Sequence, residues 1–111
     1  MPDVDIPNRI ADQSFLNQTG NVATTTLVAS ASGNYRLSVY GALAVGSTAV
    51  VSITFTWTDT SGAQSIVITL GSPGLYAHDT VFVHATSGSI SISASQAGGS
   101  TYNLYAAVEQ M

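Results

Sequence analysis

Residues 48–58 alternate between apolar and hydroxyl side chains with a period of two, and this pattern constrains the fold more than any other feature. The apolar phase carries Val51, Ile53, Phe55 and Trp57, and the other phase carries Ser52, Thr54, Thr56 and Thr58. Successive side chains of a β-strand point to opposite faces, so the segment predicts a strand with one buried and one solvated face. The turn residues at 59–62 then predict that residues 64–70 return as the second strand of a hairpin.

The same alternation predicts further strands at 22–29, 34–45, 79–86, 89–94 and 101–110, and a short one at 13–16. No segment shows the spacing of a helix of three turns. Short strands separated by Gly- and Ser-rich turns predict an all-β fold, a two-sheet antiparallel β-sandwich over residues 13–111. A jelly roll is preferred over an immunoglobulin-like sandwich, because up to eight strands follow a leading arm and the chain has no Cys–Trp–Cys arrangement.

Residues 1–12 are predicted to form an extended N-terminal arm, because Pro2 and Pro7 disfavour a helix. Two interpretations are open. The segment is either a frayed terminus or an arm that becomes ordered on a partner, with Val4, Ile6, Arg9 and Ile10 as its contact residues.

The charge composition excludes several functions. The net charge is −4, with two Arg and no Lys, so the chain has no basic patch for nucleic acid. It has no Cys for a disulfide, a thiolate metal site or a nucleophile. No apolar run reaches the roughly 18 residues of a membrane span, and the start lacks the regions of a signal peptide. We therefore expect synthesis in the cytoplasm, or export by a route that the sequence does not encode, and no nucleic-acid or membrane partner.

The outward positions of the predicted strands differ in character. Strands 48–58 and 89–94 present Ser and Thr, whereas strands 34–45, 64–70, 79–86 and 101–110 present aromatic and small apolar residues. The latter four strands are expected to share one sheet, whose outer face would be a homo-oligomer contact. Its predicted residues are Arg36, Tyr40, Val67, Phe82 and Tyr105. The alternatives are aromatic residues on a wet sheet, or an inverted face for 79–86.

No residue pattern predicts a reaction or a cofactor. His78 and His84 are six positions apart, about 20 Å along a strand, so a single metal ion cannot join them. Asp3 and Asp5 lack the further ligands of a calcium loop. Asp59 and Asp79 could be considered as the carboxylate pair of a glycosidase. Both lie beside turn signals, where Asp is expected for structural reasons. We therefore predict no enzyme activity, no metal and no cofactor.

The sole Trp, Trp57, lies in phase with the apolar side of its strand, which predicts a core position. An exposed Trp that stacks on a sugar is the alternative.

Three segments of the chain carry a resemblance to a known class of proteins. They are the Gln-Ser-Phe-Leu-Asn-Gln start of 13–45, the Gly-Asn-Tyr-Arg-Leu-Ser-Val-Tyr segment in the same range, and the closing Tyr-Asn-Leu-Tyr-Ala-Ala-Val-Glu. Over residues 13–110 the pattern resembles small β-rich structural proteins of tailed bacteriophages, of the head-decoration or tail-accessory kind. The resemblance implies a non-enzymatic virion subunit, often a trimer, that binds a capsid or tail protein. The favoured function is that of a capsid decoration (cement) subunit, whose N-terminal arm would contact the capsid or a neighbouring protomer.

Two other functions stay open at this point. One is a carbohydrate-binding or receptor-binding module, in which Tyr40 and Tyr105, or Trp57, would line a groove. The other is a segment of a tail fibre or tail tube.

Overall fold

The computed structural model describes residues 8–44, 47, 50–71, 76–96 and 99–111. These residues form strands β1 (Asn8–Gln18), β2 (Val22–Val28), β3 (Gly33–Leu43), β4 (Val51–Asp59), β5 (Gly62–Leu70), β6 (Tyr76–Ala85), β7 (Ser87–Gln96) and β8 (Tyr102–Gln110). The predicted all-β class is confirmed. Within the described residues there is no helix with the length and hydropathy needed to cross a membrane.

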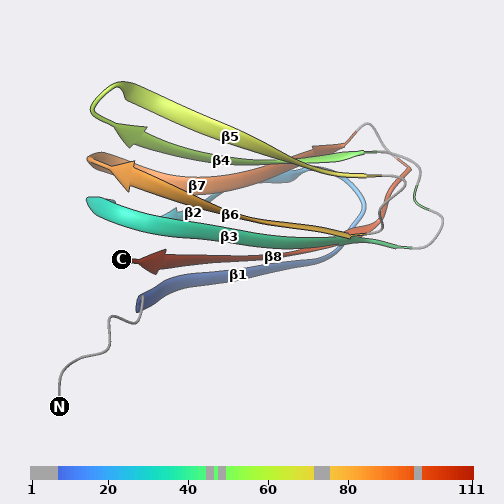
Figure 1. The fold of residues 1–111 in the computed structure, drawn as a ribbon. Coiled ribbons are helices and arrows are strands. Elements are labelled where there is room, and N and C mark those ends of the chain that lie inside the picture. Colours follow the sequence, from blue (N-terminus) through green and yellow to red (C-terminus); the bar gives the residue numbers. More distant parts are fainter. Residues whose placement is uncertain (1–7, 45–46, 48–49, 72–75, 97–98) are drawn as a thin grey trace, which may run out of the picture.

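The strands form two antiparallel four-stranded sheets packed as a sandwich (Figure 1). Sheet A has the order β1-β8-β3-β6, and sheet B has the order β2-β7-β4-β5. Each strand of the first half of the chain pairs with one of the second half, β1 with β8, β2 with β7, β3 with β6 and β4 with β5. This nested pairing is that of a jelly roll, the topology that the sequence favoured.

A short turn between Asp59 and Gly62 closes the β4–β5 hairpin that the sequence predicted. The Asp59 carboxylate accepts a hydrogen bond from the Ser61 backbone N–H at 2.7 Å, and Gly62 has a φ of 111°. That backbone conformation favours glycine. The turn fixes β5 beside β4, with every residue from Val51↔Leu70 to Asp59↔Gly62 in register.

The core lies between the two sheets and follows the predicted alternation. Its largest fully buried side chains come from both layers: Leu37, Val51, Ile53, Phe55, Leu70, Ile90, Ile92, Tyr102, Leu104 and Val108. Gly41 of β3 lets the layers approach closely, because a Cβ there would lie 3.0 Å from Leu104 of sheet A and from Leu70 of sheet B. The outward positions of β3, β5, β6 and β8 are the ones that the alternation predicted.

The predicted arm boundary at residue 12 is wrong. Strand β1 begins at Asn8 and pairs with β8 from Asn8↔Gln110 through Asp12↔Ala107, so residues 8–12 belong to the sandwich. The ladder shifts register between Arg9 and Ala11. Such a shift breaks the period-two pattern, and this explains why the alternation indicated a strand only from residue 13.

The predicted placement of residues 64–70 in the aromatic sheet is also wrong. Strand β5 lies at the edge of sheet B, and β1 takes the fourth place in sheet A. The short β4–β5 turn is the physical reason, because it joins neighbouring strands of one sheet. Val67 is exposed, as predicted, but on the face opposite Tyr40, Phe82 and Tyr105.

Candidate functional site: the tyrosine face

The strand register arranges the outward side chains of sheet A in rows that cross the strands. One row contains Ser14, Tyr105, Tyr40 and His78, and the next contains Asp12, Ala107, Ser38 and Thr80. On either side lie a row with Asn103, Ala42 and Tyr76 and a row with Glu109, Arg36 and Phe82. We call this outer surface of sheet A the tyrosine face.

Three tyrosines from three adjacent strands form a continuous aromatic strip on this face. The rings of Tyr40 and Tyr76 are stacked, with centroids 6.1 Å apart and planes 18° apart. The rings of Tyr40 and Tyr105 lie 6.2 Å apart at 47°. Both distances are typical of attractive aromatic pairs. Tyr40 and Tyr105 are 44% and 45% exposed, and Tyr76 is 63% exposed. The strip is therefore organised within the chain and open on its outer side.

A charged pair lies two rows from the strip. Arg36 Nε donates to Glu109 Oε1 at 2.8 Å, and Arg36 Nη2 lies 2.8 Å from the same oxygen. The hydrogen bond to Glu109 and the negative charge of that carboxylate raise the pKa of the Arg36 guanidinium above its usual value. Phe82, 62% exposed, faces Arg36 from β6. The register thus places an apolar ring beside a charge pair that is already neutralised.

A shallow hollow lies between the strip and the charged pair. Its floor is the row of small residues Ser38, Thr80 and Ala107, and Tyr40 and Tyr105 line one side. Asp12, His78 and Asp79 also line the hollow, whose volume is about 330 Å³. Hydroxyl, imidazole and carboxylate groups therefore lie within reach of two exposed aromatic rings, an arrangement that suits non-covalent recognition.

The histidines of β6 have separate surroundings. His84 Nδ1 lies 2.6 Å from Asn34 Oδ1, whereas His78 faces Tyr40 across the sheet. The Asp79 carboxylate accepts a hydrogen bond from the Thr80 backbone N–H at 2.8 Å. Within the described ranges, no three His, Cys, Asp or Glu side chains cluster as metal ligands would.

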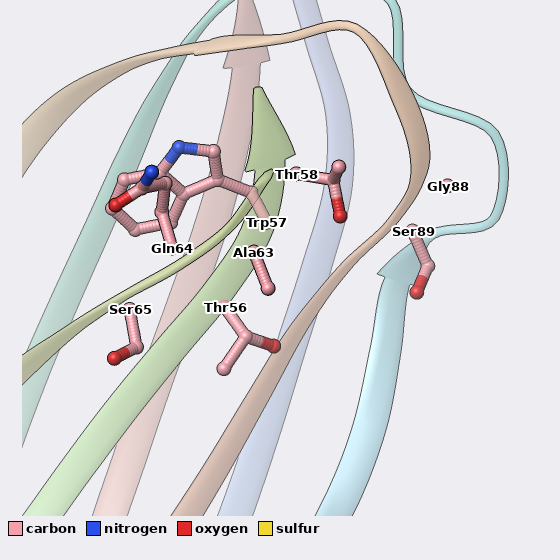
Figure 2. Close-up of a pocket in the computed structure, with 8 residues that line it drawn as sticks. All are labelled: Thr56, Trp57, Thr58, Ala63, Gln64, Ser65, Gly88 and Ser89. Carbon is pink, nitrogen blue, oxygen red and sulfur yellow. The ribbon is translucent and has the colours of Figure 1, made fainter. Parts of the chain in front are cut away.

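A second hollow, of about 480 Å³, lies at the β4–β5 end of sheet B and is lined by residues that include Trp57, Gln64, Thr56 and Ser89 (Figure 2). Trp57 is half-buried and packs against the core, so its placement falls between the two alternatives considered from sequence. Figure 2 shows the Trp57 and Gln64 side chains together on one side of the strands, with the hydroxyls of Thr56 and Thr58 on the other. The polar side of the hollow thus lacks the exposed aromatic face of a sugar platform.

The structure brings together four of the five predicted contact residues: Arg36, Tyr40, Phe82 and Tyr105. It adds Tyr76, which the sequence reasoning missed because the predicted strand began at residue 79. Extending the even-numbered phase of that strand back by two positions beyond His78 would have found it. Of the predicted arm residues, Ile10 is exposed on β1 and the backbone of Arg9 pairs with Glu109. Val4 and Ile6 lie outside the described residues.

Comparisons with known proteins give similarity in fold alone. No family model matches the chain, and no curated protein matches its sequence. One similar solved structure is the acidic stable capsid of Helicobacter pylori bacteriophage KHP30, with a TM-score of 0.56 and 20% identity over 91% of this chain and 85% of that chain. Another is the CBM22-1 xylan-binding domain of Paenibacillus barcinonensis Xyn10C, with a TM-score of 0.52 and 12% identity over 96% of this chain and 97% of that chain.

Proposed function

We propose that this chain is a non-enzymatic structural subunit of a bacteriophage virion, a capsid decoration protein that acts as a homo-oligomer through its tyrosine face. The observation that carries the proposal is the strip of Tyr105, Tyr40 and Tyr76. Phe82 is exposed on the same face, two rows away from Tyr40. Large contiguous apolar patches are rare on monomers, and aromatic residues with few unpaired charges are typical of interface centres. A trimer is the state that the phage resemblance implies.

The Arg36–Glu109 pair of the tyrosine face is compatible with coverage by another protein subunit. A buried charge is costly unless a partner compensates it. Arg36 and Glu109 neutralise each other within the chain, whereas the exposed Asp12 adds a carboxylate in the row next to them. The Arg36 and Glu109 side chains are already only 38% and 18% exposed. Covering this part of the face therefore leaves no new unpaired arginine.

The fold comparison supports a small virion subunit. The match to the phage KHP30 capsid structure covers most of both chains, so the two chains have similar lengths. A subunit of this size attaches to a much larger lattice, and contacts to several lattice subunits at once would multiply weak affinities. Residues 1–7, with exposed Ile10 at the start of β1, are our proposed contact to a capsid protein. This assignment places the chain in the virion. The alternative position for the same subunit is the phage tail.

The test replaces Tyr105 with Asp and measures the native mass by sedimentation velocity. An uncompensated carboxylate buried in a contact costs about 3–5 kcal/mol, which weakens association by more than roughly 100-fold. We expect Tyr105→Asp to lower the native mass while the far-ultraviolet circular dichroism stays that of the β-sandwich. Thr56→Asp is the control, because Thr56 is exposed on the outer face of sheet B. Equal masses for wild type and Tyr105→Asp would contradict the proposal.

The hollow beside Tyr40 and Tyr105 favours one second candidate, a carbohydrate-binding module. Exposed rings next to Asp12, Ser38 and His78 provide both a stacking surface and hydrogen-bonding groups for a sugar. This candidate predicts a monomer that binds oligosaccharides on a glycan array and loses that binding in Tyr40→Ala. An oligomer whose Tyr40→Ala and wild-type forms bind no glycan would favour the virion subunit.

A further inference from the structure

Strand β5 is an open edge of the sandwich. It is the outermost strand of sheet B in the described part of the chain, beside β4 (Figure 1). All nine of its residues pair with β4 without a register shift. In an edge strand, alternate backbone N–H and C=O groups point away from the neighbouring strand and can pair with another strand.

The other three sheet edges carry features that oppose such pairing. Strands β1 and β2 each contain two register shifts against their neighbours, and bulges twist an edge away from a new partner. Strand β6 is regular, but the Asp79 carboxylate occupies the Thr80 N–H. Over Gly62–Leu70, β5 contains neither a charged residue nor a proline. It is therefore the edge with the fewest obstacles to strand addition.

The side chains of β5 fit a strand that is held firmly on one side and open on the other. Ile68 and Leu70 are buried in the core, which fixes the strand in place. Ile66 packs against the core and is only partly buried, so a strand added beside β5 would cover it further. The outward residues Ala63, Ser65, Val67 and Thr69 are small or β-branched and uncharged, which suits a cross-strand pair.

We propose that β5 pairs antiparallel with β5 of a second copy of this chain, about a twofold axis, so that two copies of sheet B continue into one sheet. A twofold contact places the same patch of both copies face to face. For β5 this brings no like charges together, whereas the same arrangement at β6 would bring two Asp79 side chains into one contact. The contact lies on sheet B and leaves the tyrosine face free. It therefore goes beyond the proposed function and does not depend on it.

The absence of cysteine from the chain allows a direct test by single-cysteine scanning. The variants are Ala63→Cys, Ser65→Cys, Val67→Cys and Thr69→Cys. Each is oxidised alone and in a mixture with the variant two positions further along β5. Facing residues of an antiparallel pair have Cβ atoms about 4.5–5.5 Å apart, close to disulfide geometry. A residue two positions from the twofold axis lies about 13 Å from the same residue of the other copy, which is too far for a disulfide.

We expect one variant, or one mixture of adjacent variants, to form covalent dimer roughly tenfold faster than the others. If a variant crosslinks fastest alone, the twofold axis passes through that outward residue. If a mixture crosslinks fastest, the axis passes through the inward residue between the two outward ones. Thr56→Cys is the control, because Thr56 is exposed but lies inside the sheet between β5 and β7. Rates equal to that control at every position would overturn the proposal.

The same oxidation in a Tyr105→Asp background separates this inference from the proposed function. Tyr105 belongs to sheet A, so the position-specific dimer should persist when the tyrosine face is disrupted. If Tyr105→Asp has the native mass of the wild type while crosslinking at β5 persists, only the tyrosine-face contact is rejected.

Discussion

The tyrosines of this chain serve two distinct roles that depend on strand phase. Tyr35 and Tyr102 are buried, and each hydroxyl is hydrogen-bonded to backbone, the Tyr35 hydroxyl to Ser32 and the Tyr102 hydroxyl to the Gly20 carbonyl at 2.6 Å. Tyr40, Tyr76 and Tyr105 occupy the opposite phase and are exposed. Substitution of a buried tyrosine should therefore lower stability, whereas substitution of an exposed tyrosine should weaken association.

Tyr102→Phe should lower the free energy of unfolding by about 1 kcal/mol at neutral pH, the usual net contribution of one hydrogen bond. Burial raises the pKa of the Tyr102 hydroxyl. Above pH 10 the unfolded chain therefore releases a proton that the folded chain retains, and stability falls as pH rises. Urea unfolding at pH 7 and at about pH 10.5 should show a smaller loss over this interval in Tyr102→Phe than in wild type. Equal losses would show that ionisation of Tyr102 is not linked to unfolding.

At the scale of elements, most strands follow from alternation alone. The hairpin of β4 and β5, the outward phases of β3, β6 and β8, and the jelly-roll topology agree with the sequence-based expectations. Two features did not follow. The register shift at Arg9–Ala11 hides the start of β1. The sheet of Val67 was predicted from the chemistry of outward side chains, although the turn at 59–62 already indicated a hairpin with 48–58. The tyrosine face was thus predicted in part, with Tyr76 missing and Val67 misplaced.

The corrected boundary of β1 gives a prediction about truncation. Deleting residues 1–7 leaves every described β1–β8 pair intact, whereas deleting residues 1–12 removes the pairs from Asn8↔Gln110 through Asp12↔Ala107. We expect the longer deletion to lower the thermal midpoint by roughly 5 °C or more relative to the shorter one, as for a loss of about 1 kcal/mol or more in a domain of this size. Calorimetry of both forms measures this difference. Equal midpoints would mean that the first part of β1 contributes nothing to stability.

At the scale of the whole molecule, the two outer faces have different chemistry. Sheet B presents mostly Ser and Thr on its outer face, whereas sheet A presents the aromatic strip, Phe82 and a neutralised ion pair. The sequence contains only two basic and six acidic residues. A chain with so few charges and one aromatic face is suited to a covered position in an assembly, and the open β5 edge would offer a second, independent self-contact.

The native mass of the wild-type protein, measured by light scattering behind a sizing column over a range of concentrations, shows whether the chain associates with itself. One chain has a mass of 11.4 kDa. We expect a multiple of that mass, with about three times 11.4 kDa for the trimer that the phage resemblance implies. A single species of 11.4 kDa at every concentration would contradict this expectation, since Tyr40, Tyr76 and Tyr105 would then face solvent in the free protein.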